Sequence, residues 1–220
     1  MPITTHAALP NLRWFAFKGA SEYMEALLPR MTNSVLEKVH VTFFHQLTYS
    51  IPNLLQFMGT MEESLKSSRV VLMFHKEAVC IAASPREDAK IRSFYVEVGC
   101  RHLDWQVFYI TQISNTLSPI FSVAERLMLQ YKEHILSSES HNEIGRAQWR
   151  ELLRSFGSTK ILRVNDKLVG EISRALQLEE GEAPMELFPQ PKELSYSTAG
   201  SARGSLFSTF VDARRAQVAP

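Results

Sequence analysis

The stretch from Leu9 to Phe17 reads Leu-Pro-Asn-Leu-Arg-Trp-Phe-Ala-Phe. Its alternation predicts a strand with Leu12, Trp14 and Ala16 facing the core. The spacing of residues from Ser21 to Met31 predicts a helix with Ser21 as its N-cap. A leucine-spaced strand ahead of a helix returns several times downstream, at intervals of ~20 to 50 residues. The sequence therefore predicts stacked β-α units in a single α/β domain over residues 1–220.

The remaining elements follow the same alternation along the chain. We expect further strands at 36–43, 126–131, 161–164 and 194–196, and helices at 51–65, 103–121, 148–156, 168–178 and 205–216. Three short β-rich runs within 69–98 predict an inserted β-meander. Residues 137–146 and 179–191 have the composition of surface loops.

The spacing of these units decides between two architectures. No Gly-x-Gly-x-x-Gly follows a predicted strand, and no phosphate-binding Gly-x-x-x-x-Gly-Lys motif occurs, which disfavours a doubly wound nucleotide-binding domain. The irregular steps between strands favour a degenerate solenoid of the leucine-rich-repeat kind, with a mainly parallel sheet.

The composition disfavours nucleic acid and membranes as partners. The 220 residues are 45% hydrophobic and 21% charged, with a net charge of +1, so no global field attracts nucleic acid or an anionic membrane. The apolar runs are too short to cross a bilayer. The two cysteines, Cys80 and Cys100, and a start without a leader-like segment favour an intracellular protein of the cytoplasm or nucleus.

Few residues form a pattern that is typical of a metal site or a catalytic site. His75, Glu77, Cys80, Cys100 and His102 lack the paired spacing of zinc ligands and read as ordinary half-buried residues, so no metal or cofactor is expected. His102 and Asp104 stand at a helix start, where capping is a better interpretation than acid-base catalysis.

Nucleophilic catalysis also lacks a signal. The segment from Gly200 to Gly204 reads Gly-Ser-Ala-Arg-Gly and does not match a nucleophile elbow. We therefore expect a protein that is not an enzyme. The alternative, a small α/β enzyme, would place Glu97, His102 and Asp104 near a deep pocket.

A binding face can be predicted from strand alternation. If the Leu and Val positions face inward, the opposite face presents aromatic, Met and Arg side chains, which are enriched in protein interfaces. The predicted partner-binding residues are Arg13, Phe15, Phe17, Lys38, His40, Met73, Tyr95, Met128 and Arg163. The helical stripe of Trp105, Phe108 and Ile113 is interpreted as core.

Three segments carry a resemblance to a known family: Ala8 to Phe15, Thr42 to Thr60 and His102 to Gln106. They resemble the C-terminal, degenerate leucine-rich-repeat regions of F-box proteins that are abundant in mushroom-forming fungi. The resemblance implies the substrate-binding part of an adaptor of a cullin-RING ubiquitin ligase, with an unknown protein as substrate. The alternative is a free-standing interaction or scaffold domain. Docking on the Skp1-type subunit would need an F-box upstream, because the first strand begins within about a dozen residues of Met1 and leaves no room for one.

Overall fold

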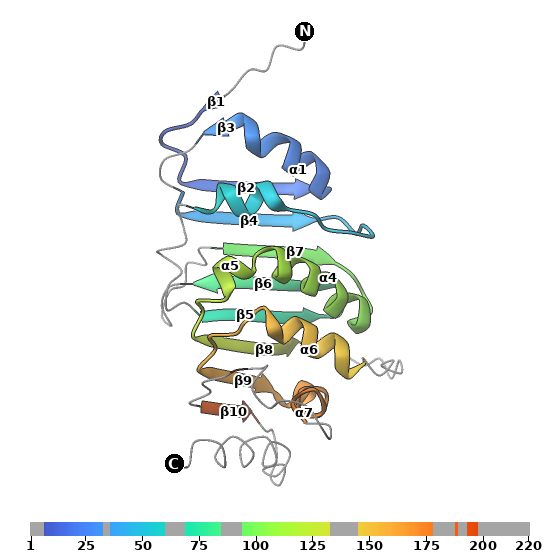
Figure 1. Cartoon of the computed structure of the whole chain (residues 1–220). Helices are drawn as coiled ribbons and strands as arrows, with labels where there is room; N and C mark the ends of the chain where they lie inside the picture. The colour runs from blue at the N-terminus through green and yellow to red at the C-terminus, as the bar shows by residue number, and fades with distance from the viewer. Residues whose placement is uncertain are drawn as a thin grey trace.

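An eight-stranded sheet forms the body of the protein. The computed structural model describes residues 7–32, 36–59, 69–84, 94–132, 145–177, 188 and 193–197. The strands are β2 (Trp14–Gly19), β4 (Lys38–Phe43), β5 (Arg69–His75), β6 (Ala78–Ser84), β7 (Phe94–Gly99), β8 (Arg126–Lys132), β9 (Ile161–Asn165) and β10 (Glu193–Ser197). Their spatial order is β2-β4-β7-β6-β5-β8-β9-β10, and only the pairs that include β6 are antiparallel (Figure 1). This confirms the predicted α/β class with a mainly parallel sheet.

The predicted meander is also confirmed. β6 pairs antiparallel with β5 and with β7, and the outer strands of this unit then join the parallel pairs β5-β8 and β7-β4. Residues 76–77 form the tight connection between β5 and β6. The meander therefore widens the sheet in its centre without interrupting it.

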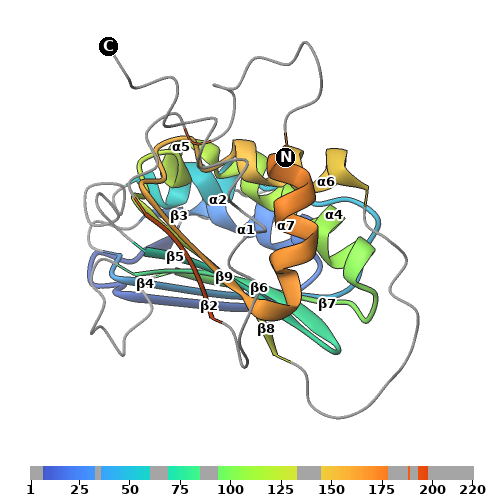
Figure 2. The same ribbon diagram turned by 90° about the horizontal axis from the view of Figure 1, so that it is seen from below.

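The helices lie on one face of the sheet, as Figure 2 shows with the sheet seen nearly edge-on. They are α1 (Ser21–Leu27), α2 (Pro52–Phe57), α4 (Leu103–Thr116), α5 (Ser118–Phe121), α6 (Arg146–Arg154) and α7 (Val169–Leu176), with the short 3-10 helices η1 (Leu28–Arg30) and η3 (Asp166–Leu168). A two-stranded sheet of β1 (Ala7–Ala8) and β3 (Met31–Thr32) lies beyond β2. Among the described helices, none has the length and apolarity to cross a membrane.

The core lies between the sheet and the helices. Alternate residues of β4 and β7, such as Val41 and Val96, are fully buried there, as is Leu72 of β5. In β2 the predicted inward residues are wrong: Phe15 is only 5% exposed, whereas Trp14 is 64% exposed. Trp14, Phe15, Ala16 and Phe17 are all apolar, so alternation over these four residues could not show which set faces the helices.

Three predicted helices differ from the structure. The helix expected at 21–31 ends as α1 at Leu27 and is followed by the 3-10 helix η1, and Met31 belongs to β3. The single helix expected at 103–121 is divided at Leu117, because Pro119 has no N–H to donate to the carbonyl of Asn115. The helix expected at 51–65 is described only to its C-cap at Met58. The helix predicted at 205–216, most of the loops at 137–146 and 179–191, and Gly200 to Gly204 lie outside the described residues.

Candidate functional site

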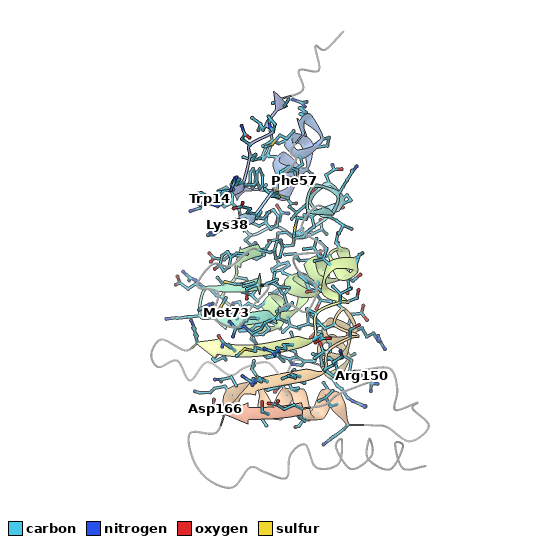
Figure 3. All side chains as sticks on the ribbon, turned by 90° about the vertical axis from the view of Figure 1, so that its left-hand side faces the viewer. Trp14, Lys38, Phe57, Met73, Arg150 and Asp166 are labelled. Atoms are coloured by element: carbon cyan, nitrogen blue, oxygen red, sulfur yellow. The ribbon has the colours of Figure 1, made fainter. Side chains whose placement is uncertain are left out.

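The sheet face that carries no described helix presents most of the predicted partner-binding residues. Lys38, His40, Met73, Tyr95, Met128 and Arg163 alternate with core residues and so point to this helix-free face. Figure 3 shows Trp14, Lys38 and Met73 on this side and Phe57 and Arg150 on the helical side. Four of the six, His40, Tyr95, Met128 and Arg163, lie in one row across the sheet, with Ala82 and Val71 in its middle.

Three of the predicted residues lie elsewhere. Phe15 belongs to the main core and its ring packs on Phe57 at a centroid distance of 5.2 Å. Phe17 packs partly buried against the same core, because β2 has the opposite face assignment to the one predicted. Arg13 precedes β2 and forms an exposed ion pair with Glu37 at 2.9 Å.

Met73 lies on the predicted face but is only 3% exposed. It forms a second, small apolar cluster with Cys80 and Ala82, against which Val71 and Tyr95 pack. The short side chains of β6 leave room for these larger neighbours to close over them. The centre of the helix-free face is therefore packed, and its accessible residues lie to either side.

A polar group adjoins this small cluster. The Tyr95 hydroxyl donates to Glu97 Oε2 at 2.5 Å and lies 3.0 Å from Cys80 Sγ, while the His40 ring meets the Tyr95 ring edge-on at 4.6 Å. Burial raises the pKa of Tyr95, and its hydrogen bonds to Cys80 and Glu97 raise it further. The hydroxyl therefore keeps its proton and acts as a donor that orders this row of side chains.

The residues named for an enzyme do not converge. Glu97 points to the helix-free face from β7, whereas His102 precedes α4 and Asp104 lies in its first turn on the helical side. His102 makes no side-chain capping hydrogen bond, so its predicted capping role is wrong. Cys80 and Cys100 likewise lie in different clusters, one on each face of the sheet.

Sequence reasoning missed an exposed apolar surface at the carboxyl ends of the strands. Leu47, in the loop after β4, is 75% exposed, and Trp105 and Phe108 of α4 are 43% and 39% exposed. These three residues are called the carboxyl-edge patch. The expectation that Trp105 and Phe108 belong to the core is wrong, while Ile113 is fully buried as predicted. Figure 1 places the loop after β4 and the start of α4 at the same end of the strands.

Polar contacts hold the loop that presents Leu47. The Tyr49 hydroxyl donates to the Phe44 carbonyl at 3.0 Å, and the Tyr49 N–H donates to Gln112 of α4 at 2.9 Å. Gln46 accepts from the Ser21 N–H at 3.0 Å and thereby ties the loop to α1. The loop between β4 and α2 is thus fixed to two helices, which reduces the entropy lost when a partner binds.

Aromatic stacking and hydrogen bonds support α4 in the same way. Trp105 stacks on Tyr109 at a centroid distance of 5.7 Å, and the Tyr109 hydroxyl lies 2.9 Å from His45 Nε2. The Gln106 amide donates to the carbonyls of His75 and Cys100, each at 2.6 Å. The start of α4 is therefore tied to the ends of both β5 and β7.

An open pocket of about 680 Å³ lies between the loop and α4. Leu47, Trp105 and Tyr109 supply its apolar walls, and Arg101 and Glu77 form an exposed ion pair at 3.9 Å on its border. A second hollow of about 550 Å³ lies over β8, β9 and β10 and includes Met128 and Arg163. The first pocket combines aromatic walls with charged groups at its border, as recognition sites for side chains do.

Comparison of the chain with protein-family models, with curated proteins and with solved structures finds no match. The assignment of a function therefore depends on the surfaces themselves.

Proposed function

We propose that this chain is a non-catalytic protein-recognition domain whose main contact surface is the carboxyl-edge patch. The observation that carries the proposal is the exposure of Leu47, Trp105 and Phe108 on tethered backbone beside a pocket. Contiguous apolar surface of this kind is uncommon on soluble monomers without a binding role. Trp and other large side chains beside a pocket are also the usual hot spots of protein interfaces.

The mechanism is positional. An apolar side chain of the partner enters the pocket against Trp105 and Tyr109, and the Arg101–Glu77 pair offers both charge signs at the border for orientation. The binding energy comes from burial of aromatic surface, and no covalent step is involved. The helix-free face supplies a second, weaker contact area through His40 and Arg163.

The proposal is tested by two matched double variants. Trp105→Ala with Phe108→Ala removes the patch, and His40→Ala with Arg163→Ala alters the helix-free face. Each variant and the wild type are used as bait, and the recovered proteins are compared by quantitative mass spectrometry, with thermal unfolding as the control for folding. We expect a defined set of proteins to be lost with the first variant and retained with the second. Recovery that depends on neither surface would contradict the proposal.

A more specific role follows from the resemblance to F-box adaptors and from the order of the units. On both sides of the meander, consecutive strands are neighbours, parallel and joined by helices: β2-α1-β4, and β8-α6-β9-α7-β10. This arrangement supports a solenoid of leucine-rich-repeat kind interrupted by a meander. We propose that such a chain holds an intracellular protein substrate, and its buried free thiols, Cys80 and Cys100, suit a reducing compartment.

The ligase link has its own test. Calorimetry would measure binding of the Skp1-type subunit of a cullin-RING ligase to the purified product of the whole reading frame, including any residues encoded upstream of Met1. Binding supports the adaptor role. If the titration shows no heat of binding at micromolar concentrations, the ligase link is wrong. The alternative, a free-standing recognition domain, is then favoured.

A further inference from the structure

The helix-free face of the large sheet is basic. Among its described strand residues, six are Lys or Arg and two are Glu: Lys18, Lys38, Arg69, Arg126, Lys132 and Arg163 against Glu97 and Glu193. This face has a formal charge of +4 (six minus two), whereas the whole chain has +1. Positive charge is thus concentrated on one side of a nearly neutral protein, which favours an anionic ligand there.

Three of these cations lie together on β5, β8 and β9. Arg69 and Arg126 are paired positions of neighbouring parallel strands, so their backbones are about 4.8 Å apart. Arg163 is paired with Met128, which follows Arg126 by two residues on the same face. It therefore lies diagonally across from Arg126, at roughly 8 Å. Arg69, Arg126 and Arg163 are called the basic cluster.

The contacts of two of these arginines leave room for an anionic ligand. Arg163 has a loose ion pair with Glu193, at 3.7 Å and with both side chains nearly half exposed. Exposed pairs of this kind contribute little, and an incoming carboxylate can replace them. Arg69 Nε is buried and has no hydrogen-bond partner among the described residues, so this guanidinium keeps a donor to use. The like charges of Arg69 and Arg126 also repel each other, and an anion beside them offsets that repulsion.

The hollow of about 550 Å³ over β8, β9 and β10 provides space for the ligand beside the basic cluster. Arg163 lies in its wall, and Lys132 adds a further cation. Its other polar side chains can hydrogen-bond a carboxylate or a peptide group, and they are those of Gln130, Asn165 and Ser195. The hollow therefore combines positive charge with neutral hydrogen-bonding groups.

We propose that the basic cluster and this hollow bind an acidic segment of a partner protein, with Asp or Glu at every second position. An extended chain places alternate side chains on one side about 6.6 Å apart, which is close to the diagonal spacing of Arg126 and Arg163. Each planar guanidinium can hold a carboxylate through two hydrogen bonds. The site refines the second contact area named above, and it rests on the proposed function only in having a protein as its ligand.

Single-stranded nucleic acid is another polyanion that a basic surface can attract. It binds where its bases can stack on aromatic side chains. The rings on the helix-free face, those of Trp14, His40 and Tyr95, belong to β2, β4 and β7. The packed centre on β6 and β5 lies between them and β8. Among the described residues, the basic cluster thus has no stacking platform beside it, and carboxylates are the better fit.

Fluorescence anisotropy with two labelled peptides tests the proposal. One peptide is a short alternation of Glu and Ser, and the other has Gln in place of every Glu. We expect the full chain to bind the Glu peptide at least about tenfold more tightly at low salt, because only carboxylates form charge-assisted hydrogen bonds with arginine. Added salt should reduce this preference by screening the charges. Equal binding of the two peptides would overturn the proposal.

Two matched double variants locate the binding. Arg126→Gln with Arg163→Gln removes two cations of the basic cluster, and Lys18→Gln with Lys38→Gln removes two cations of the same face on β2 and β4. We expect the first to weaken binding of the Glu peptide at least about tenfold and the second less than about twofold. Arg163→Glu alone, at an exposed position where folding should be retained, should also weaken it. Thermal unfolding checks the folding of each variant. Equal losses in the two double variants would show a general charge effect and would contradict a local site.

Two further probes distinguish the acidic segment from other anions. These are a single-stranded RNA oligonucleotide and vesicles of phosphatidylserine. If either binds more tightly than the Glu peptide and depends on the same arginines, an acidic protein segment is the wrong ligand.

The carboxyl-edge patch provides the control that separates this site from the proposed function. Trp105→Ala with Phe108→Ala should bind the Glu peptide as the wild type does, because these residues lie on a different surface. Failure of the peptide test therefore leaves the main recognition surface unaffected. Failure of the recognition test at the carboxyl-edge patch likewise leaves the acidic-segment site unaffected.

Discussion

Trp14 and Phe15 were assigned to the wrong faces of β2, because a shift of one residue along a strand exchanges its buried and exposed faces. The sequence Trp-Phe-Ala-Phe is apolar at both alternate sets, so its alternation does not identify the inner set. The structure buries Phe15 against Phe57 and exposes Trp14. In β4 the same reasoning succeeds, because Val39 and Val41 alternate with the polar Lys38 and His40.

These two residues provide a direct stability test. Phe15→Ala should lower the free energy of unfolding by about 3 to 5 kcal/mol, because it leaves a cavity beside Phe57. Trp14→Ala should change it by no more than about 0.5 kcal/mol when measured in dilute solution. Urea denaturation followed by circular dichroism gives both values. The opposite ranking would mean that the faces of β2 are assigned wrongly.

The accessible site residues were predictable only in part. Strand alternation identified His40, Met128 and Arg163 because their neighbours are plainly apolar. It could not show that Met73 is buried. That burial depends on the short side chains of β6, the strand that pairs with β5. Trp105 and Phe108 were missed because α4 has apolar residues on several sides, so periodicity does not distinguish its exposed side.

At the scale of elements, α2 shows how one helix supports the next. Its N-cap is Ile51, which has no side-chain acceptor, and Pro52 fills its first turn. The free amides are satisfied from α1, where the Glu25 carboxylate accepts from Asn53 at 2.7 Å and Leu54 at 2.9 Å. Burial raises the pKa of this carboxyl, and the two amide hydrogen bonds oppose the rise. A cap from another helix leaves no local signature in the sequence.

Removal of this cap should destabilise the domain. We expect Glu25→Ala to lower the free energy of unfolding by about 1 to 2 kcal/mol, as loss of a helix cap does. Glu22→Ala, at an exposed position of the same helix, is the control and should change it by less than about 0.5 kcal/mol. Chemical denaturation at neutral pH measures both. If the two variants are equivalent, the contact between α1 and α2 contributes little.

At the scale of the molecule, the class and the meander followed from the sequence, but the strand order did not. The reversal that places β7 beside β4 and β5 beside β8 depends on pairing between strands distant in the chain. Local alternation predicts where strands occur and not which strands are neighbours. The carboxyl-edge patch is a product of this order, because it joins the loop after β4 to the helix after β7.

Alkaline pH should unfold the domain through buried phenols. Burial raises the pKa of Tyr49, Tyr95 and Tyr109 above their ordinary value. A tyrosine whose pKa is raised in the folded state contributes its full stabilisation at pH values below the unfolded-state pKa of about 10. This contribution is lost as the pH rises above that value. We expect the thermal transition to fall above pH ~10 together with the appearance of phenolate absorbance.

Two variants separate this effect from general alkaline damage. Tyr95→Phe should lower stability at neutral pH through the lost hydrogen bond to Glu97, yet reduce the slope above pH ~10. Tyr23→Phe, at an exposed position, should keep the wild-type slope. Phenolate formation that is complete before unfolding begins would contradict burial of these side chains.

The most direct measurement of the recognition proposal is a side-chain footprint with a partner recovered by the wild-type bait. Hydroxyl-radical labelling of the free and bound chain reports which side chains the partner covers. We predict protection of Leu47, Trp105 and Phe108, with labelling of His40 and Met128 changed less. Full labelling of the carboxyl-edge patch in the bound state, with protection confined to the helix-free face, would contradict the central claim.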